Sequence, residues 1–292
     1  MPAPAPDHDT SQDHAARAAG IKHALAERFG SDVEVDPALP GLDTLATIAG
    51  HRSHRAYADR PIPNDLLRLL CACALSAPSK SDLQQADIVQ VADPALRATI
   101  ADLLPDNPWV REAPVFLVFC GNNRRIRQSS ELRGKTFAND HLDAFMNAAV
   151  DAGIVLSTFI RAAAAVGVGC CPISAVRNHA ATISQLLGLP DWVFPLAGLC
   201  VGYPAAPGQI SPRLPFDVTV HVDRFDDADV TERIQAYDQR RAGLQPYAKQ
   251  RYPELYGELA EYGWSEDKAR QYSQPERADF GQFIRDKGFR LE

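Results

Sequence analysis

The sequence predicts an α+β fold, or a mixed α/β fold, on the basis of three observations. Residues 86–93 (ADIVQVAD) and 112–122 (EAPVFLVFCGN) are short runs of β-branched and other apolar residues that read as strands. Residues 136–166 form a long Ala-rich segment that is apolar around most of a helical circumference, which is typical of a helix buried on all sides, in a large core or a subunit interface. The predicted helices and strands do not alternate regularly, so a repeating β-α-β series is not expected.

The other elements follow from apolar periodicity and from the residues that cap or interrupt helices. The first twenty residues are rich in Pro, Ala and Asp and read as a disordered lead, after which a helix is expected over residues 21–30. The run 64–77 (NDLLRLLCACALSA) is expected to form a helix with Asn64 as its candidate N-cap. The segment 206–223 is expected to turn through its prolines into a last strand. Further helices are expected over 42–52 and 94–104, and a further buried strand over 191–204.

Composition and charge exclude several classes of protein. Hydrophobic residues make up 46% of the 292 residues and charged residues 23%, as in ordinary globular proteins. The net charge of −7 argues against a nucleic-acid surface, which needs concentrated positive charge. The N-terminus lacks the pattern of a signal peptide, and no apolar run approaches the roughly 20 residues that span a bilayer, so a cytoplasmic protein without a membrane partner is expected. The six cysteines show no CxxC or zinc-site spacing, so reduced, buried thiols and no metal site are expected.

A basic cluster at residues 51–55 (HRSHR) is the first candidate for a binding site. Arg52 and Arg55 are three residues apart, so on a helical turn they would share a face and present two guanidinium groups to one phosphate. The same spacing also suits a basic helix end that neutralises the helix dipole or pairs with Asp59 and Asp65. This cluster alone does not decide between the two interpretations.

Three further segments carry polar or Gly-rich patterns. A polar loop over 78–82 leads into Gln84 and Gln85 at the start of the first predicted strand, where side chains can face a ligand. The Gly-rich stretch before residue 176 precedes a helix and can place backbone N–H groups near an anion or a heterocycle. Polar residues recur every four positions on the long helix and read equally well as a solvated edge or as a functional stripe: Asp143, Asn147 and Asp151.

Taken together, these segments resemble the FMN-dependent nitroreductase superfamily. The resemblance covers roughly residues 44–290 and rests on seven segments in the family's order and at about its spacings: HRSHRAYADRPIP, SAPSKSDLQ, EAPVFLVFC, AAVGVGCCPI, LLGLP, LAGLCVGYP and SPRLP. It is strongest for the oxygen-insensitive NADPH nitroreductase and flavin reductase subgroup. The resemblance implies a domain-swapped homodimer with a mixed sheet flanked by helices and one FMN in each of two pockets at the subunit interface.

The resemblance also implies which residues bind FMN. His51, Arg52, Ser53 and Arg55 match the block whose arginines lie near the phosphate or the ribityl chain, and the family's serine-rich block matches Ser79, Lys80, Ser81 and Gln84. The family's Gly-rich turn over the flavin ring corresponds to Pro172, Ile173, Ser174 and Ala175. The family's Lys-Pro-Arg segment, which supplies a lysine near the pyrimidine edge and an arginine near the phosphate, reads Ser211-Pro212-Arg213.

Ser211 is the most consequential departure from the family pattern. A fixed cation near the pyrimidine edge stabilises the negative charge of reduced flavin, and a serine brings no charge. Either another cation, with Lys80 the nearest candidate by loop position, takes this role, or the reduction potential differs from that of the relatives. The Pro, Ser and Ala in the turn are a second departure.

The activity implied is an NADPH- or NADH-dependent reduction of a flat acceptor, such as a nitroaromatic, a quinone or free flavin, by a ping-pong mechanism. Two alternatives remain open: dehydrogenation or reductive dehalogenation of a specialised metabolite, and a non-catalytic FMN-binding protein. The expected domains are an N-terminal extension (1–43), partly disordered and then helical, an FMN-binding domain (44–227) and a C-terminal extension (228–292). The C-terminal extension has few aliphatic residues and is expected to pack on another surface, such as that of a second subunit.

Overall fold

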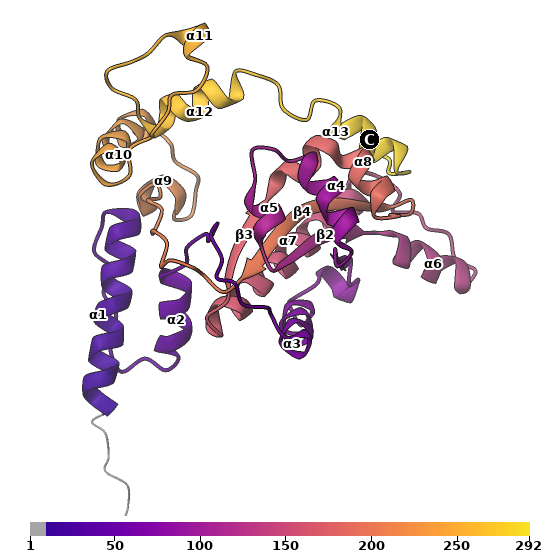
Figure 1. The fold of residues 1–292 in the computed structure, drawn as a ribbon, viewed down its shortest axis with the longest axis horizontal. Coiled ribbons are helices and arrows are strands. Elements are labelled where there is room, and N and C mark those ends of the chain that lie inside the picture. Colours follow the sequence, from indigo (N-terminus) through magenta and orange to yellow (C-terminus); the bar gives the residue numbers. More distant parts are fainter. Residues whose placement is uncertain (1–9) are drawn as a thin grey trace, which may run out of the picture. The chain divides into compact units, whose positions relative to one another are not determined.

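The computed structural model describes residues 10–292, which form two compact units (Figure 1). The sheet unit consists of residues 53–208 and 277–292, and the helical unit consists of residues 10–52 together with residues 209–276. Each unit contains its own buried core. The unit boundary after residue 52 falls within the predicted basic cluster.

The sheet unit is built on a four-stranded sheet with the order β1-β2-β4-β3. The strands are β1 Ala86–Gln90, β2 Val115–Asn122, β3 Gly169–Ile173 and β4 Val193–Gly202. All eight residues of β2 are buried, because this apolar run is covered on both faces. The three strand pairings are antiparallel, so the α+β class is confirmed, whereas the mixed sheet implied by the resemblance is not what the described chain forms by itself.

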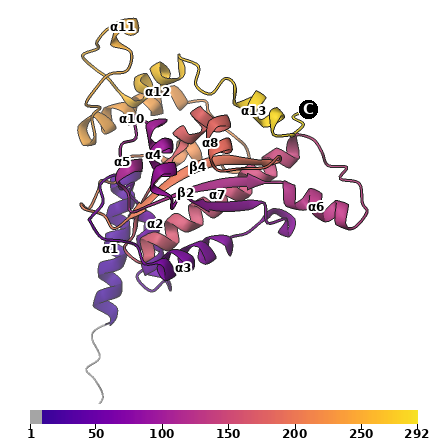
Figure 2. The ribbon, with the colours of Figure 1, turned by 45° about the vertical axis from the view of Figure 1, so that its right-hand side comes forward.

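Helices cover both faces of this sheet. Figure 2 shows α3 (Asn64–Leu75) and α7 (Leu142–Ala165) along one face, and α4 (Pro94–Asp102), α5 (Trp109–Glu112) and α8 (Ala180–Leu186) along the other. One apolar cluster lies between the sheet and the first pair, and a second lies on the opposite face. Helix α13 (Phe280–Asp286) packs against β4 through a third cluster. The remaining helical elements of the unit are η1 Lys80–Asp82, α6 Arg124–Leu132 and η2 Ser174–His179.

Helix α7 corresponds to the predicted long helix, but its surroundings are asymmetric. A stripe of small and apolar residues at helical spacing, including Ala148, Val155 and Phe159, is buried against the sheet. The other side exposes Met146 (55%) and Val150 (48%), so the expectation of burial on all sides does not hold within a single chain. By length and mean hydropathy (1.5) this helix also qualifies as a membrane span, a property that it shares with core helices of soluble proteins.

The helical unit joins N-terminal helices to the segment after β4. It contains α1 Thr10–Phe29, α2 Leu42–Ala49, α9 Phe216–Thr219, α10 Val230–Leu244, α11 Pro253–Tyr256 and α12 Trp264–Tyr272. Its core includes Ile21 and Ala24 of α1, Leu42 and Ala49 of α2, and Ile210. Helix α1 therefore begins eleven residues before the predicted helix, because the run DHAARAAG is rich in strong helix formers. The predicted disordered lead is thus wrong over residues 10–20, and its first nine residues lie outside the described part.

Two other local predictions are wrong. The last strand expected over 206–223 is a loop and the short helix α9, since the Val-Thr-Val run at 218–220 has no partner strand among the described residues. Asn64 is the first residue of α3, and the position before it, Pro63, is the N-cap, without a side-chain hydrogen bond. The predicted helices over 42–52, 64–77 and 94–104 and the predicted strands over 86–93, 112–122 and 191–204 are confirmed, with shorter bounds.

Candidate functional site

In the sheet unit, the predicted serine-rich block forms a tight loop between α3 and β1. Ser81, Asp82 and Gln84 have φ values of 50°, 56° and 51°, in the left-handed region that residues other than glycine rarely adopt. Ser81 and Gln84 are exposed. Backbone strain of this kind, of order 1–3 kcal/mol for each residue, persists only where the surroundings impose the conformation.

The buried carboxylate of Asp151 on α7 holds this loop. Asp151 is 1% exposed. Its Oδ2 accepts hydrogen bonds from Ser79 Oγ at 2.7 Å and from Gln85 N at 3.2 Å, and its Oδ1 accepts one from Lys80 N at 3.0 Å. Ser79 Oγ in turn accepts a hydrogen bond from Gln84 N at 2.7 Å. The loop is thus fastened at both ends to one charge, and charge-assisted hydrogen bonds are the stronger kind.

The hydrogen bonds of these residues show which part of the polar stripe on α7 is a solvated edge and which part is not. Asn147 Nδ2 donates to Asp143 Oδ2 at 2.7 Å on the accessible side of the helix, as a solvated edge predicts. Asp151, one turn further along, faces inward instead. The spacing of four residues carried no sign of this difference, because the partners of Asp151 come from a loop about seventy residues earlier in the chain.

A cavity of about 820 Å³ lies beside the loop. Its lining includes Ser79, Gln85 and Asp151, together with apolar side chains of α3 and α7. Gln85 is fully buried, and its Oε1 accepts a hydrogen bond from Asn123 Nδ2 at 2.8 Å, whereas its Nε2 is buried without a hydrogen-bond partner among the described residues. Arg125 at the rim donates to Gln84 O at 2.9 Å and pairs with an Asp87 oxygen at 3.1 Å. The loop therefore lies at the edge of a polar-lined hollow.

The predicted Gly-rich turn is the end of a strand rather than a free turn. Pro172 and Ile173 are the last residues of β3, and Ser174 and Ala175 begin η2. Because side chains alternate along a strand, Ile173 is buried in the core while Pro172 is exposed. Ser174 is also exposed. A ligand at this position would therefore meet Pro172, Ser174 and the local backbone rather than the side chain of Ile173.

The two arginines of the basic cluster do not share a helical face. Helix α2 ends at Ala49, and residues 51–55 are not helical. His54 N instead donates to Cys170 O of β3 at 3.0 Å. Arg55 is exposed with its Cζ 5.4 Å from the centroid of the Trp109 ring. The helical-turn premise for Arg52 and Arg55 is therefore wrong, although each remains a candidate phosphate ligand by itself.

On the helical unit, Arg52 carries a buried and unused donor. Its Nε is buried without a hydrogen-bond partner among the described residues. Buried donors are almost always paired, and leaving one unpaired costs about 1–3 kcal/mol. A guanidinium in this state is suited to receive an anionic oxygen from outside the chain.

The remaining predicted residues, Ser211 and Arg213, lie on the same helical unit as Arg52. Arg213 N donates to Arg28 O at 2.7 Å, and the Arg28 guanidinium donates to Ser211 O at 3.2 Å and to His51 O at 2.6 Å. The Ser211-Pro212-Arg213 segment and the start of the basic cluster are therefore fastened to one buried side chain. No separate pattern in the sequence marked Arg28, since one arginine in the last turn of a helix is ordinary.

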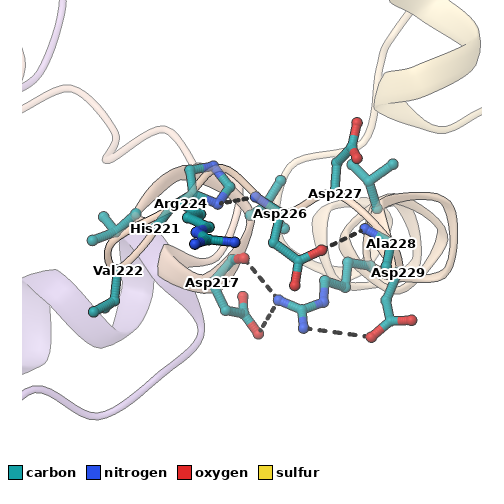
Figure 3. Close-up of a pocket in the computed structure, with 12 residues that line it drawn as sticks. Asp217, His221, Val222, Arg224, Asp226, Asp227, Ala228 and Asp229 are labelled. Carbon is teal, nitrogen blue, oxygen red and sulfur yellow. Dashed lines mark hydrogen bonds and ion pairs between the residues drawn. The ribbon is translucent and has the colours of Figure 1, made fainter.

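A second cavity on the helical unit contains none of the predicted residues. It has a volume of about 280 Å³ and is bordered by α9, by the start of α10 and by the loop between them. Figure 3 shows Asp217 and Asp229 among the residues that line it. Arg233 pairs with both, with Nη1 2.9 Å from Asp217 Oδ2 and Nη2 3.8 Å from Asp229 Oδ2. The Arg233 guanidinium in this cavity is therefore already paired with carboxylates. Among residues 10–292, no group of His, Cys, Asp and Glu side chains has the arrangement of a metal site.

Two family models match the chain. The nitroreductase family matches residues 48–203, and the C-terminal domain of the nitroreductase family matches residues 211–292. The chain therefore belongs to the nitroreductase family, as its motifs predicted. Helix α1 lies outside both matched regions.

Individual relatives agree with this assignment. The chain is 33% identical over 253 residues to FMN reductase [NAD(P)H] of Bacillus subtilis, a match that covers 86% of this chain and 99% of the relative. It is 32% identical over 200 residues to the oxygen-insensitive NADPH nitroreductase of Salmonella typhimurium, covering 68% and 81%. The solved structure of NADPH:FMN oxidoreductase from Vibrio harveyi complexed with NAD⁺ superposes with a TM-score of 0.73 at 29% identity, covering 84% of this chain and 98% of that one.

Proposed function

We propose that this protein is an FMN-dependent oxidoreductase that takes a hydride from NADPH or NADH and passes it to a flat acceptor: a nitroaromatic, a quinone or free flavin. The observation that carries the proposal is that the family matches span nearly all of residues 48–292, with a B. subtilis FMN reductase matched over 99% of its length. FMN, when bound, supplies the hydride-accepting and hydride-donating ring. Because donor and acceptor use the same pocket in turn, ping-pong kinetics are expected.

The residues present are suited to hold FMN. Its phosphate needs fixed cations and N–H donors, and the unpaired, buried Nε of Arg52 is such a donor. Hydroxyl, ammonium and amide groups of the strained loop suit the polar edges of the cofactor. We assign FMN binding to His51, Arg52, Ser53 and Arg55, to Ser79, Lys80, Ser81 and Gln84, to Pro172, Ile173, Ser174 and Ala175, and to Ser211 and Arg213.

The protein's part in the reaction is placement and electrostatics. The fastened loop keeps its polar groups in one conformation, so they need no reorganisation when a ligand arrives. Ser211 supplies a hydroxyl but no charge, so the reduction potential is expected to lie below that of relatives that carry a lysine at this position. The shape of the pocket selects flat acceptors.

The proposed assembly is a cytoplasmic, domain-swapped homodimer with FMN at the subunit interface. Support comes from apolar side chains exposed on adjacent helices of the sheet unit: Leu69 (56%) and Leu75 (53%) of α3, and Met146 (55%) and Val150 (48%) of α7. These two helices pack on each other, and each leaves apolar side chains exposed that a partner subunit would cover. Light scattering is expected to show a dimer at micromolar concentration, and a stable, flavin-loaded monomer would contradict this assembly.

Steady-state kinetics with varied donor and acceptor test the activity. We expect oxidation of NADPH or NADH that depends on a quinone or nitroaromatic acceptor, with parallel double-reciprocal lines. A flavin-loaded protein that is reduced by neither nucleotide would instead favour a non-catalytic FMN-binding protein. A protein reduced by nucleotide that turns over none of these acceptors would favour other flavin chemistry, such as dehydrogenation or reductive dehalogenation.

A further inference from the structure

Helix α1 lies outside the family-matched regions, yet its last turn is tied to both of them. The side chain responsible belongs to Arg28, which is 7% exposed. Its Nη2 donates to Ala49 O at 3.1 Å and to His51 O at 2.6 Å, and its Nη1 donates to Ser211 O at 3.2 Å. One guanidinium thus joins the residue before Arg52 to the segment that ends in Arg213.

The backbone of Arg28 completes the link. Arg28 O accepts hydrogen bonds from Arg213 N at 2.7 Å and from Arg240 Nη2 at 3.1 Å, and the same Arg240 nitrogen donates to Arg213 O at 2.7 Å. Both backbone polar groups of Arg213 are therefore held. Gly30 makes this approach possible, because its φ is +72° and a Cβ there would lie 2.7 Å from Arg240 Cδ.

Apolar packing holds the same pieces in place around these hydrogen bonds. Ile210, one residue before Ser211, is buried with Ile21 of α1 and Ala49 of α2. Tyr237 OH donates to Pro212 O at 3.1 Å from the other side. These interactions involve the backbone of Arg213 and the carbonyl of His51, the residue before Arg52. They do not involve Arg52 itself. They hold the backbones of the two segments that carry Arg52 and Arg213 in place. The buried Nε of Arg52 remains without a partner among the described residues.

We infer that Arg28 is a positioning residue for the phosphate of the cofactor. It sets the separation of Arg52 and Arg213, so that two cations borne on distant parts of the sequence converge on one anion. This inference rests on the proposed FMN binding. Helix α1, which lies outside the family matches, thereby contributes to the cofactor site.

The test compares FMN with riboflavin, which lacks the phosphate, as ligands of the apo-protein. Loss of a charge-assisted phosphate contact lowers affinity about ten- to a hundredfold. Arg28→Met is therefore expected to weaken FMN binding by about this factor while riboflavin binding changes little, so the ratio of the two affinities falls. Lys22→Met is the matched control, because Lys22 is on the same helix and makes an exposed ion pair with Glu34 at 2.7 Å. It should leave the ratio unchanged.

The outcomes separate positioning from general stability. An affinity ratio that stays at the wild-type value in Arg28→Met, whether both ligands weaken equally or neither does, overturns the inference. If Arg28→Met does not fold, Arg28→Lys decides: a lysine keeps the charge but cannot span three carbonyls, so a lowered ratio supports positioning and an unchanged ratio overturns it. A wild-type protein that binds neither flavin would instead refute the proposed function itself.

Discussion

Replacing Asp151 by asparagine tests how the loop over residues 79–85 keeps its conformation. The carboxylate accepts three hydrogen bonds, from Ser79 Oγ, Lys80 N and Gln85 N. Asparagine has nearly the same shape, but only one of its two polar atoms accepts. At least one donor of the loop is then left facing the amide NH₂ group.

The expected magnitude follows from the hydrogen bonds that this substitution removes. A hydrogen bond to a charged group contributes about 1.5–3 kcal/mol, and a buried donor left unpaired costs about 1–3 kcal/mol. Because these two figures describe overlapping effects, Asp151→Asn should lower the free energy of unfolding by about 2–4 kcal/mol. The released loop, with three residues at positive φ, should relax and weaken FMN binding at least about tenfold, the equivalent of 1.4 kcal/mol.

Urea unfolding of the apo-protein and fluorescence titration with FMN measure the two effects. Asp143→Asn is the control, because Asp143 is exposed on the same helix and contacts Asn147 on its accessible side. Its unfolding free energy should stay within about 0.5 kcal/mol of wild type. If Asp151→Asn matches that control in both stability and FMN affinity, the fastening role assigned to Asp151 is wrong.

Four further predictions concern the cofactor and the thiols. Arg52→Ala should release FMN on dialysis, with an affinity about ten- to a hundredfold lower, and full retention would refute the assignment. Ser211→Lys should raise the two-electron reduction potential by about 20 mV, equivalent to roughly 1 kcal/mol, in an anaerobic titration; an unmoved potential would mean that another cation already has this role. A thiol reagent should modify the exposed Cys73 first and the half-buried Cys71 more slowly, and reach the other four only on unfolding. Burial raises the pKa of Cys120 to about 12, so its contribution to stability should decline as the pH rises above the ordinary thiol pKa of about 8.5, which a pH series of urea unfolding measures.

The central part of the fold was predictable because its signals are local. The run after Pro114 is apolar up to Gly121 and is buried throughout in β2, and the Ala-rich segment forms α7. The errors arose where a local signal was weak or misleading. The first half of α1 is polar and Ala-rich, so apolar periodicity does not mark it, and the Val-Thr-Val run after Pro215 has β propensity but no partner strand among the described residues.

The segments that form the site were predictable from the sequence, but the contacts that arrange them in space were not. The family motifs pointed to the loop of Ser79 and to the basic cluster, whereas the two buried charges that hold them, Asp151 and Arg28, were not identified. Both act on backbone groups far away in the sequence, and spacing along one helix carries no information about such partners. The expected helical turn at Arg52 failed for a related reason, since His54 N donates to Cys170 O of β3 and not to a carbonyl of a helical turn.

The most direct test of the proposed function is an anaerobic titration of the purified protein with NADPH and, separately, with NADH. We expect a yellow protein that contains one FMN per chain and loses its visible flavin absorbance on addition of one equivalent of at least one nucleotide. A colourless protein that takes up no added FMN would contradict the proposed function, as would bound FMN that neither nucleotide reduces.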